Sequence, residues 1–113
     1  MDSRRKEDRS LCAQLLEIRW NDGAGEERRE FATLEDISRR GLSLGIETPI
    51  PEGTSVTVIY PNGRYEGEVR YCRSDELGNV VGVEFASGYA WSRRDFRPSH
   101  LLQFRLRTIK SRN

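Results

Sequence analysis

The chain has 113 residues, of which 35% are hydrophobic and 33% are charged, and its formal net charge at pH 7 is +1. This length accommodates one domain with a single hydrophobic core. A net charge so close to zero does not favour a bulk electrostatic grip on long nucleic acid. If the protein has an anion site, the positive charge of that site must be local.

The cysteines and the N-terminus give no sign of export or of a membrane. Cys12 and Cys72 lack metal-ligand spacing, and we expect two reduced, partly buried thiols. Residues 1–10 are charged throughout, unlike a signal peptide. No apolar run approaches the roughly 20 residues that span a bilayer. We therefore expect a soluble cytoplasmic protein with no membrane partner.

Glycines divide the sequence into short segments, a pattern typical of an all-β domain. The first apolar segment is 11–20, and a polar loop at 21–27 separates it from a short strand at 31–36. In segment 42–46, leucine and isoleucine alternate with serine and glycine, which indicates a half-buried strand.

The clearest structural signal is a hairpin at Asn62-Gly63, between alternating segments at 56–60 and 65–72. Asn-Gly between two such segments is the strongest short hairpin signal, because both residues tolerate positive φ. A further polar turn leads to a last strand at 81–85.

The tail fits two interpretations. Ser99 suits a helix N-cap, and the apolar residues 102, 106 and 109 have helical spacing, although 102, 104 and 106 would also suit a strand. We favour a short terminal helix. Six short strands without a βαβ pattern predict an all-β protein, a six-stranded antiparallel β-barrel with a short C-terminal helix. The expected organisation is a flexible N-terminal arm at 1–10, followed by the barrel and its tail at 11–113.

Catalytic motifs are absent from the sequence. The one histidine, His100, has no Cys, Asp or Glu cluster near it with metal-ligand spacing. Ser38 lies close to Asp36, but no neighbouring residue offers the base that a nucleophilic triad needs. There is no GxxxxGK[ST] phosphate loop. We therefore expect a protein that is not an enzyme and that needs no metal or cofactor.

The N-terminal run Arg4-Arg5-Lys6-Glu7-Asp8-Arg9 is the first candidate binding element. The arginine fork can donate two hydrogen bonds to guanine O6 and N7 or to phosphate oxygens, and its flat face can stack on a base. In an extended segment, Arg5 and Arg9 lie up to roughly 13 Å apart, a reach that suits a dinucleotide. Taken alone, the run is better explained as a solvated basic tail.

The second element is Asp36-Ile37-Ser38-Arg39-Arg40-Gly41, between two predicted strands. A carboxylate can accept hydrogen bonds from the exocyclic amine and the ring N–H of guanine, and serine adds a hydroxyl. Gly41 suits a position that needs positive φ or a close backbone approach. Taken alone, this element reads as an ordinary polar turn.

Together the two elements resemble the paired signature of the PilZ family, RxxxR followed by [DN]xSxxG. The first motif is Arg5 to Arg9, and the second is Asp36 to Gly41. The segment Gly41-Leu42-Ser43-Leu44 resembles the strand that follows the second motif, and Val81-Gly82-Val83-Glu84-Phe85 resembles a late strand of the family. The resemblance covers most of residues 4–86 and leaves neither motif incomplete.

This resemblance implies a bacterial receptor for the second messenger cyclic di-GMP. The fold would be a six-stranded antiparallel barrel, and the RxxxR segment would be an arm that closes over the ligand. By match, Arg5 and Arg9 would hold guanine and phosphate, Asp36 and Ser38 would contact the other guanine edge, and Gly41 would shape the turn. Binding would change the conformation and pass a signal to a protein partner, which the sequence does not identify.

Arg4 precedes the first motif. With a basic residue at this position, the chain resembles family members that bind an intercalated pair of ligand molecules, which makes Arg4 a further candidate contact. Arg39 and Arg40 match no motif position, and we interpret them as surface charge. The competing hypothesis is a β-barrel that works through protein contacts or binds RNA without cyclic di-GMP.

Overall fold

The computed structural model describes residues 10–92, 94 and 102–103, and all regular structure in them is β. The strands are β1 (Ser10–Asn21), β2 (Glu27–Ser38), β3 (Gly41–Ile46), β4 (Ser55–Tyr60), β5 (Gly63–Asp75), β6 (Gly78–Phe85) and β7 (Leu102–Gln103). These described residues include no helix, and so none that could cross a membrane.

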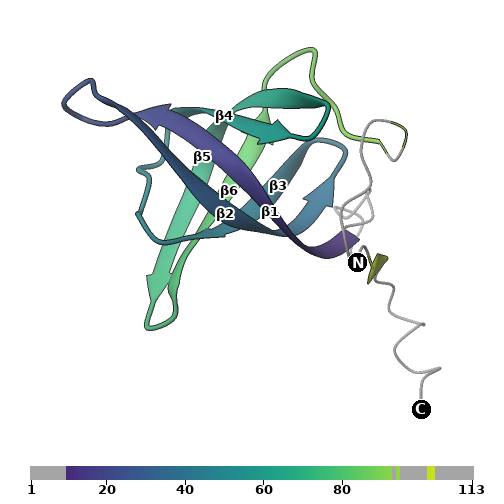
Figure 1. Cartoon of the computed structure of the whole chain (residues 1–113), viewed down its shortest axis with the longest axis horizontal. Helices are drawn as coiled ribbons and strands as arrows, with labels where there is room; N and C mark the ends of the chain where they lie inside the picture. Colours follow the sequence, from purple (N-terminus) through teal and green to yellow (C-terminus); the bar gives the residue numbers. More distant parts are fainter. Residues whose placement is uncertain (1–9, 93, 95–101, 104–113) are drawn as a thin grey trace.

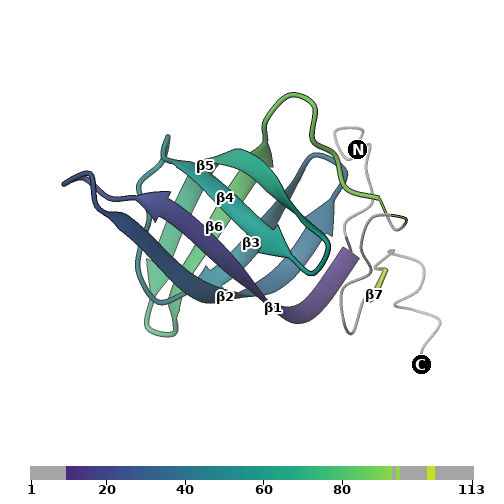
Figure 2. The ribbon, with the colours of Figure 1, turned by 45° about the horizontal axis from the view of Figure 1, so that its top comes forward.

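The six long strands close into an antiparallel barrel (Figures 1 and 2). Neighbours around the barrel follow the order β2-β3-β6-β5-β4-β1, and β1 pairs with β2 to complete the ring. Every pairing is antiparallel, so the connections can be short, as the glycine-punctuated sequence suggested. The predicted six-stranded antiparallel barrel is confirmed.

Alternate residues of each strand point inward and fill the barrel. The largest fully buried side chains are Ile18, Leu34, Ile37, Leu44, Ile50, Val58, Val69 and Val81. The predicted apolar face of segment 42–46 is buried, and Cys72 is a free thiol packed against this core. Burial of aliphatic side chains at about 1.5–3 kcal/mol each is the main favourable contribution to the stability of such a barrel.

The predicted β4–β5 hairpin forms, but its turn lies one residue earlier than the Asn-Gly signal indicates. Tyr60 pairs with Gly63, so Pro61 and Asn62 are the two loop residues. Gly63 does not have a left-handed φ. Its lack of a side chain leaves room for Tyr60, since a Cβ at this position would lie 2.7 Å from the Tyr60 hydroxyl oxygen.

Two contacts join the end of β6 and the segment after it to the β2–β3 turn. The Phe85 N–H donates to the Arg40 carbonyl at 2.8 Å, and the Trp91 N–H donates to the Arg39 carbonyl at 3.1 Å. Trp91 is buried against the core. The chain that follows β6 therefore stabilises the turn at which the second motif ends.

Little of the predicted terminal helix lies within the described residues. Its two described residues, Leu102 and Gln103, form strand β7, which pairs with Leu11 and Ser10 of β1. This strand pairing agrees with the second interpretation of the tail, in which the apolar residues 102, 104 and 106 suit a strand. The other residues of the predicted helix lie outside the described part of the chain.

Candidate functional site

The second motif lies where β2 turns into β3. Asp36 and Ser38 belong to the last three residues of β2, and Gly41 is the first residue of β3. The first motif, with Arg4, Arg5 and Arg9, lies outside the described residues. The structure therefore describes one half of the predicted site in full.

A β-bulge in β2 turns the motif side chains toward the outer surface. Ala32 and Leu34 point inward, and regular alternation would next bury residue 36, but the next buried residue is Ile37. The register accounts for this shift, because Leu34 pairs with Leu44 and Asp36 pairs with the adjacent Ser43, which leaves Glu35 as the extra residue. Without the bulge, residues 36 and 38 would follow 32 and 34 into the core.

The Asp36 carboxylate is held by the neighbouring strand. Ser43 lies opposite it on β3, and the Ser43 hydroxyl donates to Asp36 Oδ2 at 2.9 Å. Ser43 is buried, so this hydrogen bond fixes the carboxylate on the barrel wall. The sequence analysis did not identify Ser43 as a site residue, because only the register of β2 against β3 brings the two side chains together.

Gly41 serves the site through a close backbone approach. Its φ is not in the left-handed region, which corrects one of the two roles considered for it. A Cβ at Gly41 would collide with the carbonyl oxygen of Val83 on β6. Across the turn, the Ser38 hydroxyl donates to the Gly41 carbonyl at 3.4 Å. Glycine therefore lets β3 pack closely on β6 at the edge of the motif.

The outer face of β3 has only short side chains. Its outward positions hold Gly41, Ser43 and Gly45, between the buried residues Leu42, Leu44 and Ile46. Gly82 of β6 lies directly opposite Ser43 and is also a glycine. Ser43 and Gly82 are buried, and Glu35 lies over Gly45, so of this row Gly41, at the motif end, is the position most open to a ligand.

A second bulge places an aromatic ring over Gly82. In β5, Val69 pairs with Val83 and Tyr71 pairs with the adjacent Gly82, so Arg70 is the extra residue. Tyr71 therefore points outward. Plain alternation along segment 65–72 would have placed it on the same face as Val69. A Cβ at Gly82 would clash with the Tyr71 ring, and the Arg73 guanidinium lies 4.6 Å from the centre of that ring.

The start of β1 lies against the motif. Ser10 pairs with Ile37, and Leu11 pairs with Asp36. Ser10 is the first described residue, and it directly follows Arg9 in the sequence. One peptide bond therefore separates the end of the first motif from a residue paired with the middle of the second.

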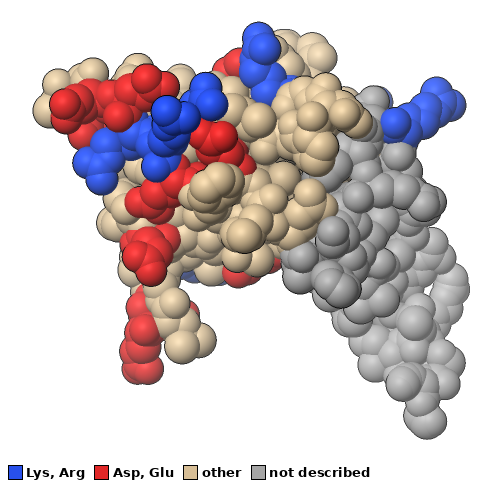
Figure 3. Space-filling view, in the orientation of Figure 1, with Lys and Arg blue, Asp and Glu red and all other residues tan. Residues whose placement is uncertain are grey.

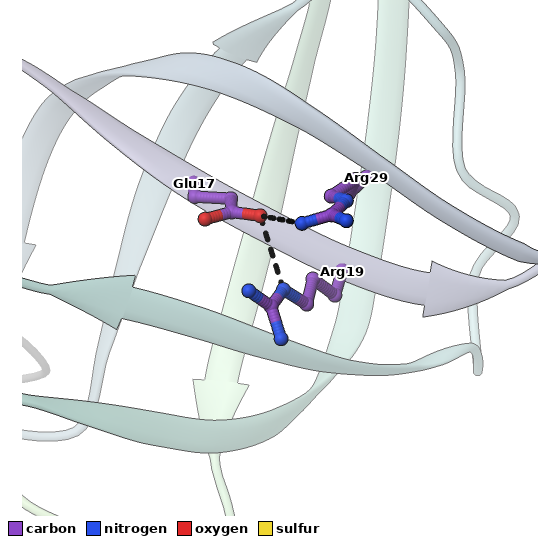
Figure 4. Close-up of polar contacts among 3 residues, drawn as sticks. All are labelled: Glu17, Arg19 and Arg29. Carbon is purple, nitrogen blue, oxygen red and sulfur yellow. Dashed lines mark hydrogen bonds and ion pairs between the residues drawn. The ribbon is translucent and has the colours of Figure 1, made fainter.

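Several arginines of the barrel outside the motif are paired with carboxylates. Glu17 of β1 accepts from Arg19 at 3.0 Å and from Arg29 of β2 at 3.5 Å (Figure 4). The hydrogen bond from Arg19, together with both charges, lowers the pKa of Glu17. Arg28, Arg64 and Arg70 likewise form ion pairs with acidic residues. These arginines are poor candidates for an anion site, since their charge is already compensated.

Arg39 and Arg40 are the described cations nearest to the motif. Both are exposed and lie inside the motif, between Ser38 and Gly41. With Tyr89 they line a hollow of about 440 Å³ on the outer surface beside the β2–β3 turn. The local positive charge that an anion site requires is thus present at this end of β2. Among the described residues, no group of three or more His, Cys, Asp or Glu side chains could hold a metal ion.

Comparisons with known proteins agree with this geometry. The family model described as "PilZ domain" matches residues 3–90. Among solved structures, the chain is similar to the PilZ domain of YcgR from Escherichia coli, which was solved with c-di-GMP. The two are 15% identical with a TM-score of 0.55, over 75% of this chain and 79% of that one. No curated protein is found to match the sequence.

Gly41→Ala tests the role of the close approach. We expect this substitution to lower the free energy of unfolding by about 1–3 kcal/mol, because the added methyl group overpacks β3 against backbone atoms of β6. Urea denaturation would measure the change. Gly23→Ala is the matched control, since a Cβ there has nothing within 4 Å. Equal stabilities for the two variants would contradict the packing argument.

Proposed function

Because the chain belongs to the PilZ domain family, we propose that it is a receptor for cyclic di-GMP, which binds between the N-terminal arm and the outer face of β2 and β3. The observation that carries the proposal is the geometry of the second motif. Asp36 and Ser38 point outward, and Ser10, the last residue of the arm, pairs with Ile37 between them. Both motifs can therefore act on one ligand.

In this proposal, the β2 side chains recognise guanine. A carboxylate accepts hydrogen bonds from the ring N–H and the exocyclic amine of guanine, a pattern that adenine does not offer. The hydrogen bond from Ser43 orients the Asp36 carboxylate before the ligand arrives, which reduces the entropy lost on binding. Ser38 adds a hydroxyl group at the same edge of the site.

The arm supplies the positive charge. Arg5 and Arg9 donate charge-assisted hydrogen bonds to phosphate and guanine, and the exposed Arg39 and Arg40 add local positive potential. The absence of a side chain at Gly41, which is partly exposed, lets a planar base approach the barrel wall. Contacts between the ligand and the arm give residues 1–10 a defined position relative to the barrel at 11–113.

The output of the receptor is a conformational signal to a protein partner, with no chemistry on the ligand. The arm closes when its arginines reach the nucleotide, and this change alters the surface that a partner meets. The ligand is a regulatory molecule, and no cofactor or metal takes part. A titration that detects no cyclic di-GMP binding would instead favour a barrel that acts through protein or RNA contacts alone.

Arg5→Ala and Arg9→Ala test the arm. Each removes a charge-assisted contact of roughly 1.5–3 kcal/mol, so we expect affinity for cyclic di-GMP to fall about ten- to a hundredfold. Isothermal titration calorimetry would measure the affinity. Arg28→Ala is the control, because this exposed arginine pairs with Asp22 away from the motif. Wild-type affinity in both arm variants would eliminate the proposed role of RxxxR.

Asp36→Asn and Ser38→Ala test the guanine contacts. The asparagine can still accept the hydrogen bond from Ser43, but it cannot accept two hydrogen bonds from guanine, so we expect weaker binding with an intact fold. Calorimetry and thermal denaturation without ligand would separate the two effects. A large loss of thermal stability with unchanged affinity would show that these residues are structural.

Arg4→Ala tests the number of ligand molecules. If Arg4 adds a further phosphate contact, we expect the wild-type chain to bind two intercalated nucleotides and the variant to bind one. The stoichiometry from calorimetry, confirmed by native mass spectrometry, would distinguish the two cases. A one-to-one wild-type complex would remove the special role of Arg4 and leave the receptor assignment intact.

A further inference from the structure

A second hollow lies on the outer surface, further along β2 and β3 from the motif. Its volume is about 640 Å³, and its walls are β2, the end of β3 and the β5–β6 hairpin. The floor is the row Thr33, Gly45 and Val80, which are paired across the three strands. We refer to this hollow as the hairpin groove.

Two large apolar side chains of the hairpin groove are exposed. Phe31 is 72% exposed on one wall, and Leu77 is 95% exposed at the tip of the β5–β6 hairpin on the other. An isolated exposed leucine needs no explanation, but two such side chains on opposite walls of one hollow form an anchor site for an apolar group. Leu15 is also exposed, at 63%, but it does not line the groove.

Four acidic residues surround these anchors: Glu35, Glu47, Asp75 and Glu76. None of them forms an ion pair with a basic residue in the described part of the chain, whereas Glu17, Asp22 and Glu66 each have an arginine partner. In Figure 3 the hairpin at the lower left shows acidic side chains, and most Lys and Arg side chains of this face lie higher. The carboxylates of the groove therefore carry negative charge that no ion pair within the described residues neutralises.

The walls of the hairpin groove are held in place by side-chain hydrogen bonds. The Asn79 amide donates to the Glu47 carbonyl at 2.7 Å and to the Ile46 carbonyl at 3.3 Å, which ties the hairpin to the end of β3. Beside the groove, the Thr48 hydroxyl donates to Glu30 and joins the chain after β3 to β2. Asp75 Oδ1 accepts from the Leu77 N–H at 2.8 Å and fixes the turn that presents Leu77. A groove shaped in advance costs less entropy to fill.

We propose that the hairpin groove docks a segment of a partner protein in which basic residues flank an apolar side chain. The apolar side chain packs between Phe31 and Leu77, and the basic residues pair with the surrounding carboxylates. The carboxylates favour a partner segment with positive charge, and the two apolar anchors favour an apolar side chain between them. This assignment is independent of nucleotide binding, because it rests on no residue of either motif.

A library of random ten-residue peptides, displayed on phage and selected on the full-length protein, tests the proposal. We expect the enriched peptides to contain several Lys or Arg residues around a leucine or an aromatic residue. Fluorescence anisotropy of the most enriched peptide would then measure affinities. Leu77→Ser and Phe31→Ser should each weaken binding by about tenfold or more, as expected for anchor residues. The control, Leu15→Ser, should bind as the wild type does.

Charge is tested separately. Glu76→Gln and Glu47→Gln should each lower the affinity for the same peptide and make that affinity less sensitive to salt. Glu52→Gln, outside the groove, should do neither. Enriched peptides that are acidic, or that bind Leu77→Ser as tightly as the wild type, would overturn the proposal. Residues 104–113 of this chain include four basic residues and are a competing occupant. If peptides bind only after these residues are deleted, the groove belongs to that segment and the partner assignment is wrong.

Discussion

The arrangement of the outer face depends on one irregularity, the bulge at Glu35 in β2. It shifts the strand by one residue, so that Ile37 enters the core and Asp36 leaves it. A regular strand would bury the Asp36 carboxylate among aliphatic side chains, at a cost far larger than the net stability of a small domain allows. The bulge makes an acidic motif compatible with a closed apolar core.

A second bulge, at Arg70 in β5, extends this arrangement across the barrel. Asp36, Ser43, Gly82 and Tyr71 form one row over β2, β3, β6 and β5. The carboxylate lies at one end of the row, and the Tyr71 ring at the other end covers Gly82. Two local irregularities, combined with long-range pairing, thus place a carboxylate and an aromatic ring on the outer surface of the barrel.

The sequence predicted the fold well because alternation, Gly-rich turns and hairpin spacing are local signals. It also predicted both motifs, and the structure describes the second. It did not predict the bulges, since nothing in Leu34-Glu35-Asp36 marks the extra residue, and plain alternation placed Tyr71 with Val69. Ser43 was missed because its contact with Asp36 depends on register. The turn at Pro61 shows the same limit, since Asn62-Gly63 indicated the hairpin but not which two residues form its loop.

The two proposed sites differ in charge although they share one face. The motif end has the exposed Arg39 and Arg40, and the hairpin groove has four carboxylates, of which Glu35 is the sequence neighbour of Asp36. Partial desolvation and the charge of Asp36 raise the pKa of Glu35. Screening at physiological salt acts over about 8 Å, so each end keeps its own local potential. In the proposed arrangement, an anionic nucleotide is repelled by the groove, and a basic segment is repelled by Arg39 and Arg40. The two proposed ligands therefore differ in charge, and neither competes for the site of the other.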